Sequence, residues 1–77
     1  MYKRLRDLRE DNDLTQQDVA KILNISQRGY SHYETGNNDI PTEILIKLAK
    51  LYNTSTDYIL GITKDKKPYS KVIWLFL

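Results

Sequence analysis

The chain has 77 residues, of which 40% are hydrophobic and 29% charged, the balance of one small globular domain rather than a disordered tail or a membrane protein. So short a chain leaves little core to hold a deep catalytic cleft, and the absence of cysteine excludes a disulfide framework and a cysteine-ligated zinc site. The formal net charge is only +2, and residues 64–77 contribute +3 of it, with four lysines against one aspartate, so residues 1–63 sum to −1. A nucleic-acid interface on this part of the chain must therefore depend on where its charges lie rather than on their total.

The first predicted element is an amphipathic helix at the N-terminus. Tyr2, Leu5 and Leu8 recur at steps of three residues, with charged side chains between them. The helix should end at residues 11–13, Asp-Asn-Asp, because these residue types tolerate the left-handed conformation that a helix end often needs.

A second helix is predicted from about residue 16 to Leu23, on the strongest local signal in the chain. Thr15 and Asp18 have the spacing of a capping box, in which each side chain bonds to the backbone amide of the other residue. Leu14 and Val19 occupy the two positions of a hydrophobic staple. This pattern predicts where the helix begins.

A third helix is predicted over residues 26–34. Asn24 can adopt the left-handed turn that ends the second helix, and Ser26 is the expected N-cap of the third. Ile25 and Tyr30 repeat the staple spacing, and Gly36 stops the helix.

The remaining pattern predicts a loop over residues 36–39 and two further helices. Pro41 is expected at the first position of the fourth helix, and Ser55 and Gly61 should cap and end a short fifth one. No strand is indicated before residue 70, so the predicted fold class is all-α. The buried stripe of the fourth helix should comprise Ile44, Leu45, Leu48, Ala49 and Tyr52.

Two short helices joined by a tight turn form a helix-turn-helix. The chain from Leu5 to Gly61 resembles the phage-repressor type of this motif, the family of lambda repressor and Cro, also called the XRE family. The resemblance rests on these motifs in order: Leu5-x-x-Leu8-Arg9, Leu14-Thr15-Gln16-x-x-Val19-Ala20, Ile25-Ser26, Tyr33-Glu34-x-Gly36, Leu45-x-x-Leu48-Ala49-x-x-Tyr52 and Ser55-x-Asp57-x-Ile59-Leu60-Gly61. It implies a compact five-helix lambda-repressor-like domain, here residues 1–63, that binds operator DNA.

The resemblance also assigns roles to individual residues. The helix at 26–34 would be the recognition helix, lying in the major groove with its N-terminal end at the bases. Base contacts are expected from four of its side chains: Gln27, Arg28, Ser31 and His32. Ser31 could contact a phosphate instead of a base. Phosphate contacts are expected from the start of the second helix and the loop after the third: Gln16, Asn37 and Asn38.

The chemistry of these side chains fits a base-reading surface independently of the resemblance. Arg28 can donate two hydrogen bonds to guanine, and Gln27 can pair bidentately with adenine. His32 can donate or accept. A glycine at position 29 departs from the family pattern and costs about 1 kcal/mol of helix stability relative to alanine.

Several residues have structural interpretations that compete with functional ones. Arg9 could contact a phosphate, but the resemblance favours a pair with Glu34. Tyr30 and Tyr33 lie at staple or inner-face spacing, which favours the core over stacking platforms. No nucleophile or carboxylate is placed to form a catalytic set with His32, so we expect no enzyme. With no cysteine and a single histidine we expect no metal site, and we expect no cofactor.

The C-terminal segment lies outside the resemblance. Residues 64–68 read as a linker, and residues 69–77 form an apolar tail that needs a partner surface. We expect this tail to mediate a homodimer. Its apolar run of six residues is far shorter than the roughly 20 residues of a membrane span, and the N-terminus lacks a signal peptide, so we expect a cytoplasmic location.

The sequence thus predicts a sequence-specific DNA-binding transcriptional regulator, most simply a repressor that binds a palindromic operator as a dimer. No small-molecule ligand and no membrane contact are expected. The alternative is a protein-interaction module, an antitoxin or adaptor that uses the same fold and holds a partner with its apolar tail.

Overall fold

The computed structural model describes residues 2–68, so the predicted apolar tail at 69–77 lies outside the described residues. Within them the chain is all-helical, as predicted. The helices are α1 (Lys3–Asp11), α2 (Gln16–Leu23), α3 (Gln27–Thr35), α4 (Thr42–Leu51) and α5 (Thr56–Leu60). None of the described helices is long and apolar enough to cross a membrane.

The ends of α2 follow from the local chemistry of the sequence. Thr15 Oγ1 accepts the Asp18 amide at 3.1 Å, and Asp18 Oδ2 accepts the Thr15 amide at 2.9 Å, so the capping box is confirmed. The hydrogen bonds from Thr15 lower the pKa of the Asp18 carboxyl. At the other end Asn24 is left-handed, with φ of 59°, which turns the chain into α3.

The start of α4 differs from the prediction by one residue. Pro41 is the N-cap, not the first helical residue, because its ψ of 146° is extended although its φ of −58° would suit a helix. Its carbonyl still accepts the Leu45 amide at 2.9 Å, the bond expected of an N-cap.

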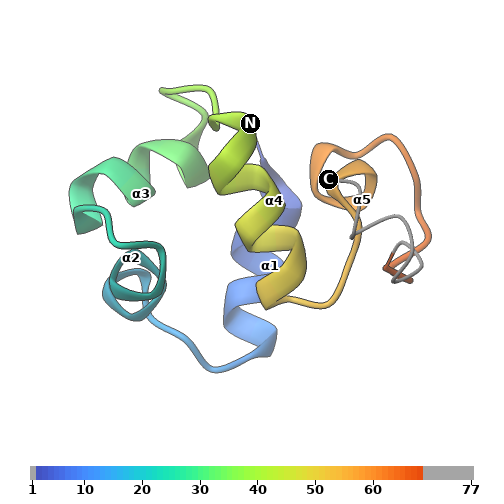
Figure 1. Cartoon of the computed structure of the whole chain (residues 1–77), viewed down its shortest axis with the longest axis horizontal. Coiled ribbons are helices and arrows are strands. Elements are labelled where there is room, and N and C mark those ends of the chain that lie inside the picture. The colour runs from blue at the N-terminus through green and yellow to red at the C-terminus, as the bar shows by residue number, and fades with distance from the viewer. Residues whose placement is uncertain (1, 69–77) are drawn as a thin grey trace.

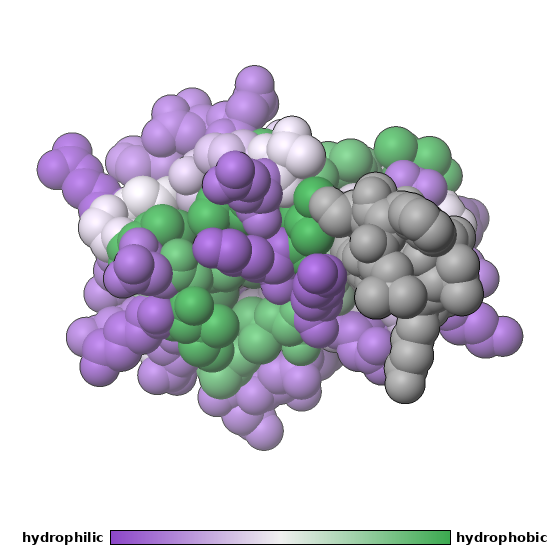
Figure 2. Space-filling model, in the orientation of Figure 1, coloured by the Kyte–Doolittle hydropathy of each residue, from purple (hydrophilic) through white to green (hydrophobic). Residues whose placement is uncertain are grey.

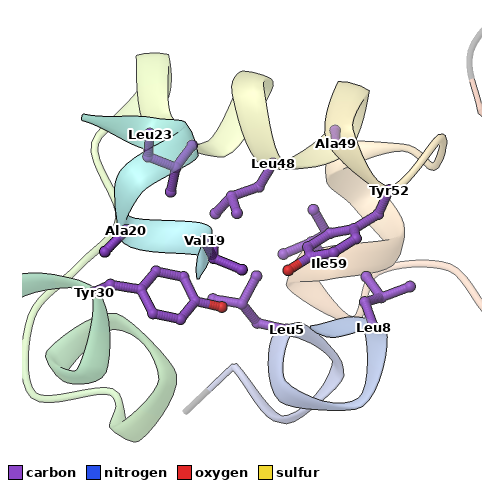
Figure 3. Close-up of a cluster of buried hydrophobic side chains, with 10 residues drawn as sticks. All are labelled: Leu5, Leu8, Val19, Ala20, Leu23, Tyr30, Leu48, Ala49, Tyr52 and Ile59. Atoms are coloured by element: carbon purple, nitrogen blue, oxygen red, sulfur yellow. The ribbon is translucent and has the colours of Figure 1, made fainter. Parts of the chain in front are cut away.

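The core draws a side chain from every helix (Figure 3). Tyr30 is fully buried, and Tyr33 is half-buried against the core, which confirms the structural interpretation of both tyrosines. Of the predicted stripe on α4, Leu48, Ala49 and Tyr52 are buried, while Ile44 and Leu45 pack against the core from its edge. The buried cluster comprises Leu5, Leu8, Val19, Ala20, Leu23, Tyr30, Leu48, Ala49, Tyr52 and Ile59.

The helix-turn-helix occupies one side of the molecule (Figure 1). α2 packs on α3, α1 contacts both α3 and α5, and α4 contacts α5. Because α1 reaches both sides, it fixes the helix-turn-helix relative to the C-terminal part of the domain.

The segment after α5 is held on the domain by hydrogen bonds. Arg4 Nη1 donates to the Tyr58 carbonyl at 2.8 Å and also to the Thr63 carbonyl, and the Arg4 guanidinium lies 4.3 Å from the centre of the Tyr58 ring. Thr54 Oγ1 donates to the Lys66 carbonyl at 2.8 Å. The predicted linker therefore starts in contact with the domain, and the domain boundary at residue 63 stays a prediction.

Apolar side chains also remain on the surface. Ile22 on α2, Leu60 on α5 and Ile62 just beyond it are the exposed large hydrophobic residues among residues 2–68. Figure 2 shows further apolar surface between α2 and α4, within an otherwise largely polar face.

Candidate nucleic-acid interface

The first turn of α3 presents its polar side chains to solvent. Ser26 is the N-cap, and its Oγ accepts the Gly29 amide at 3.0 Å. Gln27 and Arg28 follow the cap directly and are both exposed. The cap thus fixes the backbone while these two side chains stay available for a ligand.

Five of the seven predicted contact residues line one shallow hollow of about 520 Å³. Residues 27, 28, 31 and 32 share a helix face because side chains three and four positions apart are neighbours. The fifth residue comes from the start of α2, which packs beside α3. The hollow is lined by Gln16, Gln27, Arg28, Ser31 and His32.

The other two predicted residues adjoin this hollow through His32. The Asn37 side-chain nitrogen Nδ2 lies 3.3 Å from His32 Nδ1. The Asn38 amide donates to the His32 carbonyl at 3.3 Å. The structure therefore brings five of the seven residues together in the hollow and sets Asn37 and Asn38 next to His32 at its edge, and the contacts of all seven with DNA remain a proposal.

Behind this surface, Arg9 and Glu34 form the predicted ion pair. Arg9 Nε lies 2.6 Å from Glu34 Oε2, and Arg9 Nη2 donates to Glu34 Oε1 at 3.2 Å. Arg9 Nη1 also donates to the Leu14 carbonyl at 2.8 Å. The pair joins α1 to α3, and Glu34 is only 7% exposed.

Glu34 also bonds to Gln16, a contact that sequence reasoning missed. Gln16 Nε2 donates to Glu34 Oε1 at 3.3 Å. The two residues are 18 positions apart, and no sequence pattern joins them. A predicted phosphate contact is therefore held by the same carboxylate that pairs with Arg9.

Glu34 remains ionised despite its burial. Burial alone raises the pKa of the Glu34 carboxyl. The hydrogen bond from Arg9, with further contributions from the nearby Tyr30 hydroxyl, the charge of Arg9 and the Gln16 amide, outweighs burial, so the pKa lies below its ordinary value. The hydrogen bond to Glu34 in turn raises the pKa of Arg9. The pair is thus fully charged at neutral pH.

Two tyrosine hydroxyls lie beside this pair. Figure 3 shows those of Tyr30 and Tyr52 pointing toward each other across the core. Both are buried, and neither has a hydrogen-bond partner of good geometry within residues 2–68, although both lie close enough to Glu34 to feel its charge. Burial raises the pKa of both phenols, so they stay neutral.

Gly29 is the third residue of α3 and lies next to the side chain that caps the helix. A Cβ at this position would lie 3.1 Å from Ser26 Oγ, the atom that caps α3. A side chain at this position would require Ser26 Oγ to shift by a few tenths of an ångström. The same position of α2 holds Asp18 beside the capping hydroxyl of Thr15, so the cap alone does not require glycine.

A second hollow, of about 630 Å³, lies on the other side of Gln16. Three cations and three carboxylates line it, so its charges balance and give it no net attraction for phosphate. Its lining residues are Lys3, Arg6, Asp7, Arg9, Glu10, Gln16, Glu34 and Thr35.

Comparison with known proteins agrees with this architecture. A family model described as helix-turn-helix matches residues 5–59. The chain is 42% identical over 69 residues to YobD of Bacillus subtilis (strain 168), an uncharacterized HTH-type transcriptional regulator, covering 88% of this chain and 62% of YobD. It is 46% identical over 59 residues to the HTH-type transcriptional regulator ImmR of the same organism, covering 77% of this chain and 46% of ImmR.

A third relative has a different kind of name. The antitoxin PezA of Streptococcus pneumoniae serotype 4 is 35% identical over 66 residues, covering 86% of this chain and 42% of PezA. The chain thus spans between 42% and 62% of the length of these three relatives. No solved structure matches it significantly. The helix-turn-helix match covers most of the chain, and the chain therefore belongs to the phage-repressor type of helix-turn-helix proteins, the XRE family.

Proposed function

We propose that this protein is a sequence-specific DNA-binding transcriptional regulator that reads its site with α3. The observation that carries the proposal is the hollow in which Gln16 of α2 meets the polar face of α3. Its side chains supply the donors and acceptors that base edges require, on a helix whose N-terminal turn is exposed. Membership of a family whose relatives are named transcriptional regulators supports the same function.

Base reading falls to the side chains of α3. Arg28 would donate two hydrogen bonds to O6 and N7 of guanine, and Gln27 would pair with adenine through N6 and N7. Ser31 and His32 lie one turn further along the same face and would contact the neighbouring bases.

Gln16 would hold the DNA backbone. It is the first residue of α2, where free backbone amides and the helix dipole favour an anion. Its amide nitrogen carries two hydrogens, and one goes to Glu34. The second remains for a phosphate oxygen. Arg9 neutralises Glu34, which would otherwise repel that phosphate.

A dimer on a palindromic operator is part of this proposal. One recognition helix reads only a few base pairs, so two half-sites about one helical turn apart give useful specificity. The predicted dimer segment lies outside the described residues, but the exposed Leu60 and Ile62 offer an alternative apolar surface near α5. Repression is the simplest mode of action, because occupancy of an operator is enough to block polymerase.

Selection of bound sequences from random DNA at two salt concentrations tests the proposal. We expect a palindromic motif that survives the higher salt concentration, because base contacts depend less on counterion release than phosphate contacts do. Arg28→Ala should weaken the best site by about 1–3 kcal/mol and relax the preference at one base position of each half-site.

Gln16→Ala is the matched comparison from the same hollow. It should weaken binding to all sequences about equally and leave the base preferences intact. Uniform weakening by Arg28→Ala would show that Arg28 contacts phosphate rather than a base.

The similarity to the antitoxin PezA supports one alternative function, a protein-interaction module. A module that binds a protein partner, as an antitoxin does, would not require a DNA motif. Absence of any enriched sequence in the selection would favour that function over the regulator.

A further inference from the structure

His32 is the chain's one histidine and lies in the second turn of the candidate recognition helix. Its side chain lines the hollow beside Ser31 and Arg28. A neutral imidazole has one donor nitrogen and one acceptor nitrogen, and the residue type alone does not decide which is which. The base group that His32 can recognise therefore depends on which residue hydrogen-bonds to its ring and fixes the tautomer.

Asn37 holds the ring from the loop that follows α3. Its Nδ2 lies 3.3 Å from His32 Nδ1. In this orientation of the Asn37 amide its nitrogen faces the ring and has only hydrogens to offer, so Nδ1 accepts with its lone pair and the proton of the neutral ring sits on Nε2. No residue within 2–68 bonds to Nε2, so this N–H is available to a ligand.

The backbone keeps Asn37 in reach of His32. Gly36 is left-handed, with φ of 81°, and turns the chain back over the last turn of α3. The Asn38 amide and the Thr35 hydroxyl both donate to the His32 carbonyl at 3.3 Å. Side chain and main chain of residue 32 are thus held by the same loop.

We propose that Asn37 is a positioning residue that fixes His32 as an Nε2–H donor, so that this position of the recognition helix selects a base edge carrying an acceptor. The inference rests on the proposed function and makes it more specific. It gives Asn37 a part in base selection rather than only in backbone contact.

The expected base follows from the pattern of donors and acceptors in the major groove. Guanine presents two adjacent acceptors there, N7 and O6, and thymine presents O4. Cytosine presents only the N4 donor. On the strand that His32 contacts, guanine should be favoured and cytosine disfavoured.

The tautomer can be measured without DNA. We would record nitrogen-15 NMR spectra of the full chain at a pH at which the spectrum itself shows a ring with a single proton. A single histidine makes the ring signals unambiguous. We expect the proton on Nε2 in the wild type and on Nδ1 in Asn37→Asp, because a carboxylate can only accept. A wild-type proton on Nδ1, or no movement of the proton in the variant, would overturn the inference.

Sequence selection at the same pH tests the consequence for reading. In Asn37→Asp the lone pair on Nε2 faces the groove, and the preference at one position should move from guanine toward cytosine or adenine, which offer donors. We expect the ratio of guanine to cytosine there to fall by about three- to tenfold, the range of one neutral hydrogen bond.

Asn38→Asp is the matched control, because it adds the same charge one residue away while only the backbone of Asn38 contacts His32. It should lower affinity for all sequences without changing that ratio. Equal ratios in the two variants would overturn the inference. A wild-type chain that selects no motif would instead reject the proposed function, and the NMR result would still decide the tautomer.

Discussion

Replacing Glu34 with alanine should lower the free energy of unfolding by about 3–5 kcal/mol, because it leaves the Arg9 guanidinium without its partner in a largely buried site. That loss is a large part of the total stability of a domain this small, which is of the order of 4–11 kcal/mol. Urea unfolding followed by circular dichroism measures it. A double change with Arg9→Leu should cost less than the sum of the two single changes, because it leaves no charge unpaired.

The exposed pair of α1 provides the matched control. Arg6 Nε lies 2.8 Å from Glu10 Oε1, but both side chains are more than half exposed, and such pairs contribute little. The same double-mutant cycle on this pair should give nearly additive effects. Additivity at Arg9 and Glu34 as well would show that the buried pair does not couple α1 to α3.

The contribution of Glu34 should also depend on pH. Its pKa in the folded protein lies below the value of about 4.3 for an unfolded chain. A depressed carboxyl pKa stabilises the fold above the unfolded pKa, and that stabilisation is lost as the pH falls through the folded pKa. The difference in stability between wild type and Glu34→Ala should therefore narrow in acid, and a constant difference down to about pH 2 would contradict the assignment.

The local parts of this fold could be predicted from the sequence because their causes are local. Thr15 and Asp18 satisfy each other's amides within one helical turn, and Asn24 needs only its own tolerance of positive φ. The sequence does not separate the N-cap from the first helical position at Pro41, because the proline ring fixes φ at about −65° in either place. The ψ value that separates them depends on how the loop enters α4.

Contacts between elements were harder to predict. The bond from Gln16 to Glu34 and the meeting of the Tyr30 and Tyr52 hydroxyls depend on the angles between helices, which no short pattern specifies. Helical spacing explains why the candidate base-contacting residues of α3 share one face, but their roles, like that of Gln16, came from the family resemblance. The hollow that they share with Gln16 and the contact between Asn37 and His32 depend on how the elements pack and on the left-handed turn at Gly36.

Replacing Leu48 with alanine should lower the free energy of unfolding by about 2–5 kcal/mol. Leu48 is fully buried, so the substitution removes buried apolar atoms and leaves a cavity in the core. It lies at the centre of the core, among side chains from all five helices (Figure 3). For a domain of this size the loss lowers the melting temperature by roughly 10–30 °C. Thermal unfolding followed by circular dichroism measures the shift.

Leu60→Ala removes the same atoms from a side chain that is 42% exposed, and it should lower the melting temperature far less. Equal shifts would show that Leu48 does not have the burial described here. None of the residues that line the hollow comes from α4, so Leu48→Ala should keep the wild-type base preferences at a temperature where it is still folded. We therefore expect the substitution to change stability without changing base preference, because α4 contributes Leu48 to the core while α3 and the start of α2 form the surface that would face DNA.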